Sequence, residues 1–352
     1  MKILEPIFLE AIFKNCKEKS LHGKWVRFKN IEQLIKNHDS NFKVLQLGSS
    51  ENNVPIYSLK IGTGKKKILL WSQMHGNEST GTKALFDLFN FISTKNSNEV
   101  AIILKECTLL FLPMLNPDGS EAYTRVNANK VDLNRDAVNK IAKESKLLRS
   151  VLEDFNPQFC FNLHDQRTIF GVEGTNKPAT ISFLAPSEEI SRTVTKGRIA
   201  TMNVIVAMNA LLQKMIPNHV GRYTDEYYPT ATGDNFQKLG YNTILIESGH
   251  YPNDYDREIT RAYTFYAIVQ GLYHIAIEHS FTEHKDYFKI PNNVKSFYDV
   301  IHRYSNIKED EAYQYEDLIL ENKLVSKLNK IENETLKGKF GHHEIVFESL
   351  KI

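Results

Sequence analysis

Two short segments of the chain combine histidines with a carboxylate in a pattern that could bind a catalytic metal. Residues 74–78 (MHGNE) place His75 and Glu78 three positions apart, and residues 161–165 (FNLHD) contain a second histidine, His164. Two imidazoles and one carboxylate are a standard ligand set for catalytic zinc, which keeps a further coordination position open for water. If the three side chains converge, the sequence predicts a metallohydrolase.

Each segment follows an apolar run of the kind that forms a buried strand. Residues 67–71 precede the first segment, and residues 158–161 lead into the second. A spacing of three lets His75 and Glu78 reach one ion from a single turn, and Gly76 between them lets the backbone bend. Taken alone, this pattern is more often a histidine at a sheet edge followed by a glutamate in the first turn of a helix, where the helix dipole favours it.

Three further segments carry polar residues that could complete such a site. They are residues 115–119 (LNPDG), 123–136 (YTRVNANKVDLNRD) and 242–250 (NTILIESGH). In this order and at these spacings, the five segments resemble the zinc carboxypeptidase family typified by carboxypeptidase A, over roughly residues 45 to 280. The resemblance implies one zinc ion per chain, bound by His75, Glu78 and His164, and Asp165 could orient a ligand from behind.

The same resemblance implies roles for four more side chains. Glu247 matches the general base that takes a proton from water, and Arg125 matches the arginine that stabilises the oxyanion. Asn134 and Arg135 match the pair that binds the terminal carboxylate of the substrate, which a guanidinium fork fits well. A fixed cation directed at developing negative charge is a strong catalytic device in a dry site.

Two of these assignments have structural alternatives. Glu247 follows an apolar strand, where an apolar wall would raise its pKa toward the range useful for a base. It could instead form a salt bridge with Arg257 or Arg261. Arg135 could pair at the surface with one of the aspartates beside it in the sequence.

Residues 223–236 should supply the parts of the site that choose the substrate. The family carries a mobile tyrosine over the substrate, and Tyr223, Tyr227 and Tyr228 are the candidates here, with Tyr228 favoured. The side chain that lines the specificity pocket should come from the same stretch. Asp234 in that position would indicate a substrate with a basic or amine-bearing end.

Composition narrows the classes of protein. The 352 residues include 44 lysines and arginines and 42 acids, so the net charge is +2, which argues against a nucleic-acid or polyanion binder. The first ten residues contain acids and a proline where a signal peptide needs an apolar stretch, and no segment has the length of a membrane span. We therefore expect a cytoplasmic protein that binds neither nucleic acid nor membrane.

The alternation of strand-like and helical segments predicts an α/β protein whose sheet is covered on both faces. Strands are predicted at 44–48, 56–62, 67–71, 108–113, 159–163, 180–184 and 243–246, and helices at 80–94, 140–154, 188–214 and 257–279. The resemblance implies a mixed eight-stranded sheet between helices. We expect a helical extension at 1–45, the catalytic domain at 46–280 and a small β-rich domain at 281–352.

The leading functional prediction is a zinc metallocarboxypeptidase that removes C-terminal residues from peptides with a free carboxylate. The nearest alternative is a small-molecule amidohydrolase of the aspartoacylase and succinylglutamate desuccinylase type, which shares the fold and several of these positions. The NPDG segment and the long gap from Arg125 to Asn134 favour the carboxypeptidase. A metal-free binding module on a dead hydrolase scaffold would need a missing ligand or base, and all are present.

Overall fold

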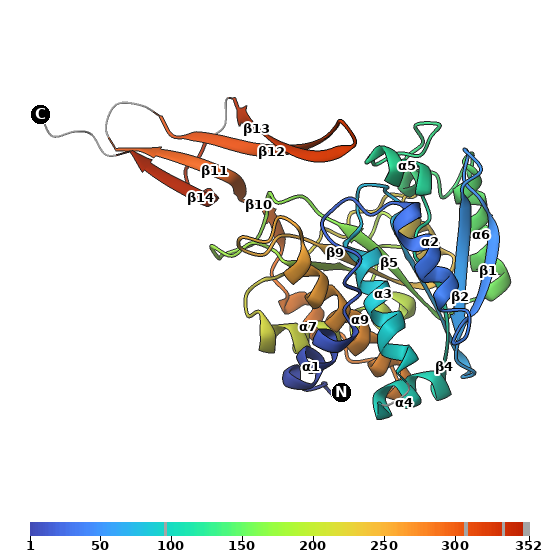
Figure 1. Cartoon of the computed structure of the whole chain (residues 1–352). Coiled ribbons are helices and arrows are strands. Elements are labelled where there is room, and N and C mark those ends of the chain that lie inside the picture. The colour runs from blue at the N-terminus through green and yellow to red at the C-terminus, as the bar shows by residue number, and fades with distance from the viewer. Residues whose placement is uncertain (95–96, 306–308, 333–334, 348–352) are drawn as a thin grey trace, which may run out of the picture.

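The computed structural model describes residues 1–94, 97–305, 309–332 and 335–347, and its centre is a mixed eight-stranded sheet (Figure 1). The strands of this sheet are β1 (Lys43–Ser49), β2 (Pro55–Ile61), β3 (Lys66–Ser72), β4 (Cys107–Leu112), β5 (Phe159–Asp165), β7 (Ile181–Leu184), β8 (Val220–Arg222) and β9 (Asn242–Ser248). Their order is β1-β2-β4-β3-β5-β9-β7-β8. The central strands β4, β3, β5 and β9 run parallel to one another.

Helices cover both faces of the sheet, as predicted. One face packs against α3 (Thr80–Ser93), α4 (Asn98–Glu106), α7 (Lys196–Met215) and α9 (Glu258–Ile277), with α1 (Pro6–Cys16) and α2 (Phe28–Asn37) at its margin. Figure 1 shows α3, α7 and α9 lying together on this face. The other face packs against α6 (Lys143–Phe155) and α8 (Thr232–Lys238). Short helices α5 (Pro117–Ala122), η1 (Leu133–Arg135) and η2 (Lys285–Lys289) complete the set.

Strand β3 shows why the central strands are apolar without interruption. Ile68 and Leu70 point into the core formed with α3, α7 and α9, whereas Leu69 and Trp71 point into the core formed with α6 and α8. Successive side chains of a strand face opposite sides, so a strand buried on both faces needs apolar residues at every position. All four residues are fully buried, which confirms the predicted fold class.

Helices α7 and α4 are examples of differences from the predicted pattern. The helix expected from residue 188 begins only at Lys196, because Thr195 is its N-cap and accepts a hydrogen bond from the Arg198 backbone. Helix α4 was not predicted, and the Ser97 side chain caps it in the same way. In both cases a short polar side chain sets a boundary that the apolar periodicity does not reveal.

The C-terminal region forms a second sheet of four strands with the order β13-β12-β11-β14. These strands are β11 (Phe297–Tyr304), β12 (Glu311–Leu320), β13 (Lys323–Ile331) and β14 (Phe340–Phe347). A small ladder of β10 (Asn293–Lys295) with β6 (Phe170–Val172) lies before it. Figure 1 shows the four-stranded sheet projecting from the eight-stranded sheet, so the β-rich appendage is present. Among the described helices, none is both long and apolar enough to cross a membrane.

Candidate active site

The register of the central strands brings the predicted ligands and the predicted base to one edge of the sheet. In the parallel pair β5–β9, His164 lies directly opposite Glu247. Strand β3 lies on the other side of β5, and His75 follows three residues beyond its end at Ser72. The carboxyl ends of these parallel strands therefore converge, as expected for an α/β site.

The loop that carries His75 is held in place by the NPDG segment. The Asn116 side chain donates a hydrogen bond to the Met74 carbonyl (3.1 Å) and accepts one from the Gly119 backbone (2.8 Å). A Cβ added at Gly76 would lie 1.9 Å from the Gly119 carbonyl carbon. Gly76 is therefore needed for close backbone contact with α5, which differs from its predicted role in a bend.

His75, Glu78 and His164 form a compact cluster of potential ligands. One ligand atom from each side chain lies within 4.8 Å of the other two. The Nδ1 atoms of the two histidines are 3.1 Å apart, and each is 2.8 Å from an oxygen of Glu78. The histidine side chains are 1% and 2% exposed, so water cannot easily replace a partner there.

The donor set of this cluster fits a metal ion. Asp132 accepts a hydrogen bond from His75 Nε2 (3.1 Å), so the Nδ1 of the neutral ring presents a lone pair to the Glu78 carboxylate. Two acceptors at this distance repel each other unless a cation or a proton lies between them. A carboxylate behind a ligating histidine also fixes the ring and its tautomer, as is common at zinc sites.

Electrostatics within the cluster favour the cation-binding forms of Glu78 and His164. Burial raises the pKa of Glu78, but the charges and hydrogen bonds of His75 and His164 outweigh it and hold that pKa well below its usual value. Burial lowers the pKa of His164 despite its contact with Glu78. Burial also lowers the pKa of His75, but Glu78 and Asp132 together outweigh burial and raise that pKa above its usual value. A metal would compete with that proton.

Arg125 lies at the open side of the cluster. Its Nε donates to Asp132 (2.9 Å) and its guanidinium is 3.4 Å from a Glu78 oxygen. The side chain is 45% exposed, so it can also face a substrate. The arrangement places a cation beside the three ligand side chains, as the resemblance implies.

Glu247 is partly buried, and its carboxylate has no hydrogen bond or salt bridge among the described residues. Arg257 donates instead to the backbone carbonyls of Ser248 and Gln166, and Arg261 pairs with Asp87 (2.6 Å). The two salt bridges considered as alternatives for Glu247 therefore do not form. Burial, together with the negative charges of Glu78 and Asp165, raises the pKa of Glu247 well above its usual value.

Asn134, Arg135 and Tyr228 lie together beside α8. The Asn134 side chain accepts a hydrogen bond from the Thr232 backbone (3.0 Å), and the Arg135 guanidinium lies 5.7 Å from the centre of the Tyr228 ring. Within the described ranges, Arg135 forms no salt bridge with a neighbouring aspartate. Tyr228 is 45% exposed, which leaves it accessible.

Asp234 has a clear local role in the structure. Its carboxylate accepts a hydrogen bond from the Tyr228 backbone (3.2 Å), it is buried in the first turn of α8, and burial raises its pKa to about 6. Tyr223 is the tyrosine whose pKa is raised by burial and then by the charges of Glu247 and Glu78. Tyr223 is among the three candidates that the sequence offers for the mobile tyrosine over the substrate, of which Tyr228 is the favoured one.

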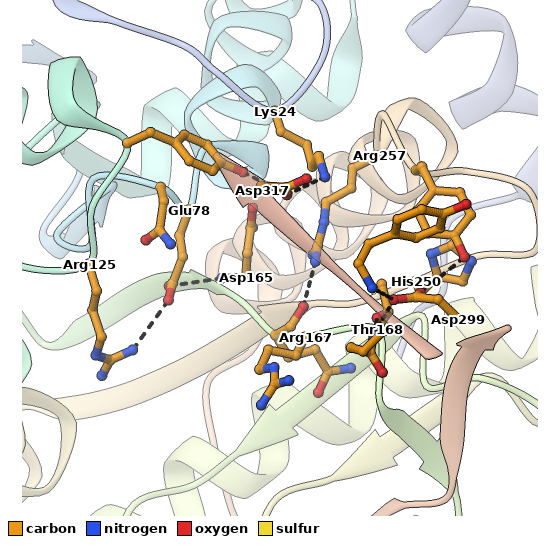
Figure 2. A pocket seen from close by; sticks show the side chains of 16 residues that line it. Lys24, Glu78, Arg125, Asp165, Arg167, Thr168, His250, Arg257, Asp299 and Asp317 are labelled. Atoms are coloured by element: carbon orange, nitrogen blue, oxygen red, sulfur yellow. Dashed lines mark hydrogen bonds and ion pairs between the residues drawn. The ribbon is translucent and has the colours of Figure 1, made fainter. Parts of the chain in front are cut away.

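A pocket of about 290 Å³ opens beside Glu78 and Arg125 (Figure 2). Its wall also contains Lys24, Asn77, Tyr123, Asp165, Gln166, Arg167, Thr168, His250, Tyr255, Arg257, Asp299, Gln314, Tyr315 and Asp317. Most of these residues were not singled out from the sequence, because they come from distant segments and follow no motif. Asn134, Arg135, Tyr228 and Asp234 do not line this pocket.

Comparison with known proteins supports the resemblance drawn from the sequence. Residues 29–195 match the family model described as zinc carboxypeptidase. This confirms the resemblance to the zinc carboxypeptidase family. Carboxypeptidase SOL1 of Arabidopsis thaliana is 27% identical over 170 residues, which are 43% of this chain and 35% of that protein. Carboxypeptidase 2 of Trichophyton equinum is 23% identical over 157 residues, or 42% of this chain and 28% of that protein.

Solved structures share the fold of the zinc carboxypeptidase family with this chain. Thrombin activatable fibrinolysis inhibitor matches with a TM-score of 0.60 and 12% identity, over 77% of this chain and 81% of that chain. Carboxypeptidase A from Helicoverpa armigera matches with a TM-score of 0.57 and 15% identity, over 78% and 81%. The chain spans only about a third or less of the length of the curated relatives above, so these matches support the resemblance to the family, and the solved structures show the fold.

Proposed function

We propose that this protein is a zinc metallocarboxypeptidase that removes C-terminal residues from peptides. The observation that carries the proposal is the convergence of His75, Glu78 and His164, with Glu247 opposite His164 in the strand register. A buried set of two imidazoles and one carboxylate is the donor chemistry of catalytic zinc. The match to the zinc carboxypeptidase family supports the choice of peptide bonds as the target.

The chain supplies the proton transfer and the charge stabilisation. When bound, zinc would polarise the scissile carbonyl and lower the pKa of a water molecule. Glu247 has no competing salt bridge in the described chain and a raised pKa, so it is suited to take a proton from water and pass it to the leaving amine. Arg125 is held by Asp132 beside the cluster, where its charge would stabilise the developing oxyanion.

Asn134 and Arg135 would make the enzyme an exopeptidase. Arg135 forms no salt bridge among the described residues, so its guanidinium can bind the terminal carboxylate of a substrate. Tyr228 lies against this guanidinium and is exposed, so it is positioned to cover the bound end. We favour this reading over the small-molecule amidohydrolase because the relatives found are carboxypeptidases.

The test compares a peptide with a free C-terminus and the same peptide with an amidated C-terminus. Amidation removes the anion that Arg135 would bind, so kcat/KM should fall about 30-fold to several thousand-fold. Arg135→Ala should lower activity on the free acid and shrink the gap between acid and amide. Arg192→Ala, at an exposed arginine that does not line the pocket beside Glu78, is the matched control.

Equal cleavage of the acid and the amide would contradict the carboxylate clamp. Cleavage of N-acyl amino acids together with no activity on peptides would favour the amidohydrolase instead. Either result is read from the same assay, with the substrate as the only variable.

A further inference from the structure

The pocket beside Glu78 is lined by none of the residues of the proposed carboxylate clamp. Glu78 and Arg125 line it, but Asn134, Arg135 and Tyr228 do not. If the clamp holds the C-terminal residue of a substrate, the chain on the other side of the scissile bond must leave the cluster by another route. The pocket is then the space that receives the residue on the acyl side.

The four-stranded C-terminal sheet forms part of the wall of this pocket. Asp317 on β12 pairs with Lys24 and accepts a hydrogen bond from the Tyr123 hydroxyl (3.3 Å). Gln314, also on β12, donates to the Thr168 hydroxyl (2.6 Å). These contacts fix β12 against the segments that carry the cluster. The four-stranded sheet therefore packs against the catalytic region and forms part of the wall of this pocket.

The carboxylates of the wall are already engaged within the protein. Glu78 contacts both histidines, Asp165 accepts two hydrogen bonds from Thr80, Asp299 accepts from Tyr255 and the Tyr315 backbone, and Asp317 pairs with Lys24. The Arg125 guanidinium likewise forms ion pairs with Asp132 and Glu78. Two arginines of the wall, Arg167 and Arg257, form no salt bridge with any described carboxylate.

These two arginines differ in how they are held. Arg257 donates to the backbone carbonyls of Ser248 and Gln166, and its own backbone has a φ of 57°, a left-handed conformation that a residue with a Cβ adopts at a cost. Arg167 is exposed and has no hydrogen-bond partner in the described part of the chain. Figure 2 shows both on the wall of the pocket.

Several polar atoms of the wall also lack a partner although they are buried. Asn77 Oδ1, Asp165 Oδ1, His250 Nε2 and Gln314 Oε1 are buried without a hydrogen bond. A buried polar atom without a partner is costly, and such atoms often mark where a ligand or ordered water completes the structure. Three of these four atoms are oxygens, so a donor group or an ordered water would complete them.

We propose that this pocket binds the residue on the acyl side of the scissile bond and that Arg167 and Arg257 select an acidic side chain there. The inference rests on the proposed carboxypeptidase function and names its substrate class. A carboxylate would supply the charged partner that Arg167 lacks and would add to the two carbonyl partners of Arg257. A lysine side chain would instead meet two cations that form no salt bridge among the described residues. The selectivity thus comes from residues outside the segments that carry the predicted metal ligands.

The experiment uses the zinc-loaded protein of residues 1–352 and three substrates that differ only in one residue. These are N-acetyl dipeptides with Glu, Gln or Lys on the acyl side and one accepted C-terminal residue throughout. The Glu substrate should have a kcat/KM about 10- to 100-fold above that of its uncharged isostere Gln, because charge-assisted hydrogen bonds are gained. The Lys substrate should be the slowest.

Variants of Arg167 then test which residue provides the preference. Arg167→Gln should reduce the ratio of Glu to Gln cleavage, Arg167→Lys should restore most of it, and Arg167→Glu should shift the preference toward Lys. Arg192→Gln, an exposed arginine outside the pocket, should leave the ratio unchanged. Cleavage of all three substrates at equal rates by the wild type would overturn the pocket inference alone. No cleavage of any peptide would overturn the carboxypeptidase proposal beneath it.

Discussion

The ligand cluster and the pocket beside it are built in opposite ways. The cluster of His75, Glu78 and His164 is formed at the ends of adjacent strands of one sheet, and its histidines are almost fully buried. The pocket is assembled from distant segments, from Lys24 to Asp317, and the residues that line it all carry polar or charged groups. The proposed chemistry therefore depends on the core of the eight-stranded sheet, whereas the proposed selectivity depends on the appended four-stranded sheet.

This difference has energetic consequences. Strands β3, β5 and β9 are packed on both faces, so their ends can move little without disrupting two cores. The pocket wall depends on a few side-chain contacts such as those of Lys24 and Gln314 with their partners. Substitutions in the cluster should therefore abolish function, and substitutions in the pocket wall should adjust it.

The largest effect is expected from His164→Ala. It removes one of three ligands, so stoichiometric zinc and peptide cleavage should both be lost, as measured by plasma mass spectrometry and by turnover. Circular dichroism should show that the fold persists. His279→Ala, at an exposed histidine, is the control. Full retention of zinc in His164→Ala would sink the assignment of the ligand.

Glu247→Gln should lower catalysis without affecting metal binding, although Glu247 and the ligands lie at the same edge of the sheet. The amide keeps the shape of the side chain but cannot accept a proton, so turnover should fall at least about 10²- to 10⁴-fold while zinc content stays the same. Glu153→Gln, at an exposed glutamate of α6, provides a control. Turnover like that of the wild type would show that Glu247 is structural.

The cluster could be predicted from sequence because its information is local. Apolar runs mark β3, β5 and β9, and polar residues stand where each run ends. Parallel neighbours then place these residues at one edge. The roles of Asn116 and Gly76 in bracing the loop were less visible, because they depend on contact between α5 and a segment that is distant in sequence.

The pocket could not be predicted for the opposite reason. Its residues, such as Thr168, Gln314 and Asp317, share no regular spacing in the sequence. The prediction of a β-rich region at 281–352 also does not say which segments β12 packs against. Side-chain contacts between distant segments leave no periodic signal in sequence. The boundaries of the three expected domains stay a prediction.

Asp234 lies neither in the ligand cluster nor on the wall of the pocket beside Glu78, and its substitution should have an effect of intermediate size, on stability. Its pKa is raised to about 6 by burial, so the folded protein holds this proton more tightly than the unfolded chain does. Stability should therefore fall as the pH rises from about 4 to 6, and the full penalty should be present above 6. Asp234→Asn should raise the free energy of unfolding at pH 7.5 by about 1–3 kcal/mol and have little effect near pH 4.

This measurement uses urea unfolding of wild type and variant at both pH values. Asn keeps an oxygen that can accept the hydrogen bond from the Tyr228 backbone, so the loss of the charge is the main change. A variant that is equally destabilised at both pH values would show that Asp234 acts through its hydrogen bond instead of through its protonation.

The smallest effect is expected where the pocket wall is anchored, at Lys24. Its ammonium pairs with Asp317, and the two side chains are 17% and 20% exposed, so solvent screens the pair only in part. Lys24→Met keeps the length of the side chain and should lower the free energy of unfolding by about 1 kcal/mol. Asp317→Asn and the double variant complete a cycle that isolates the energy of the pair.

Lys24→Met also tests whether the two regions are independent. If β12 shapes only the pocket, the variant should bind zinc as the wild type does and should lose part of its preference for an acidic residue on the acyl side. The reason is that, among the described residues, Asp317 would keep its hydrogen bonds with Tyr123 and Ser326 alone, and these hold the strand less firmly. Loss of zinc from Lys24→Met would contradict the comparison, because it would mean that the appended sheet also supports the ligand cluster.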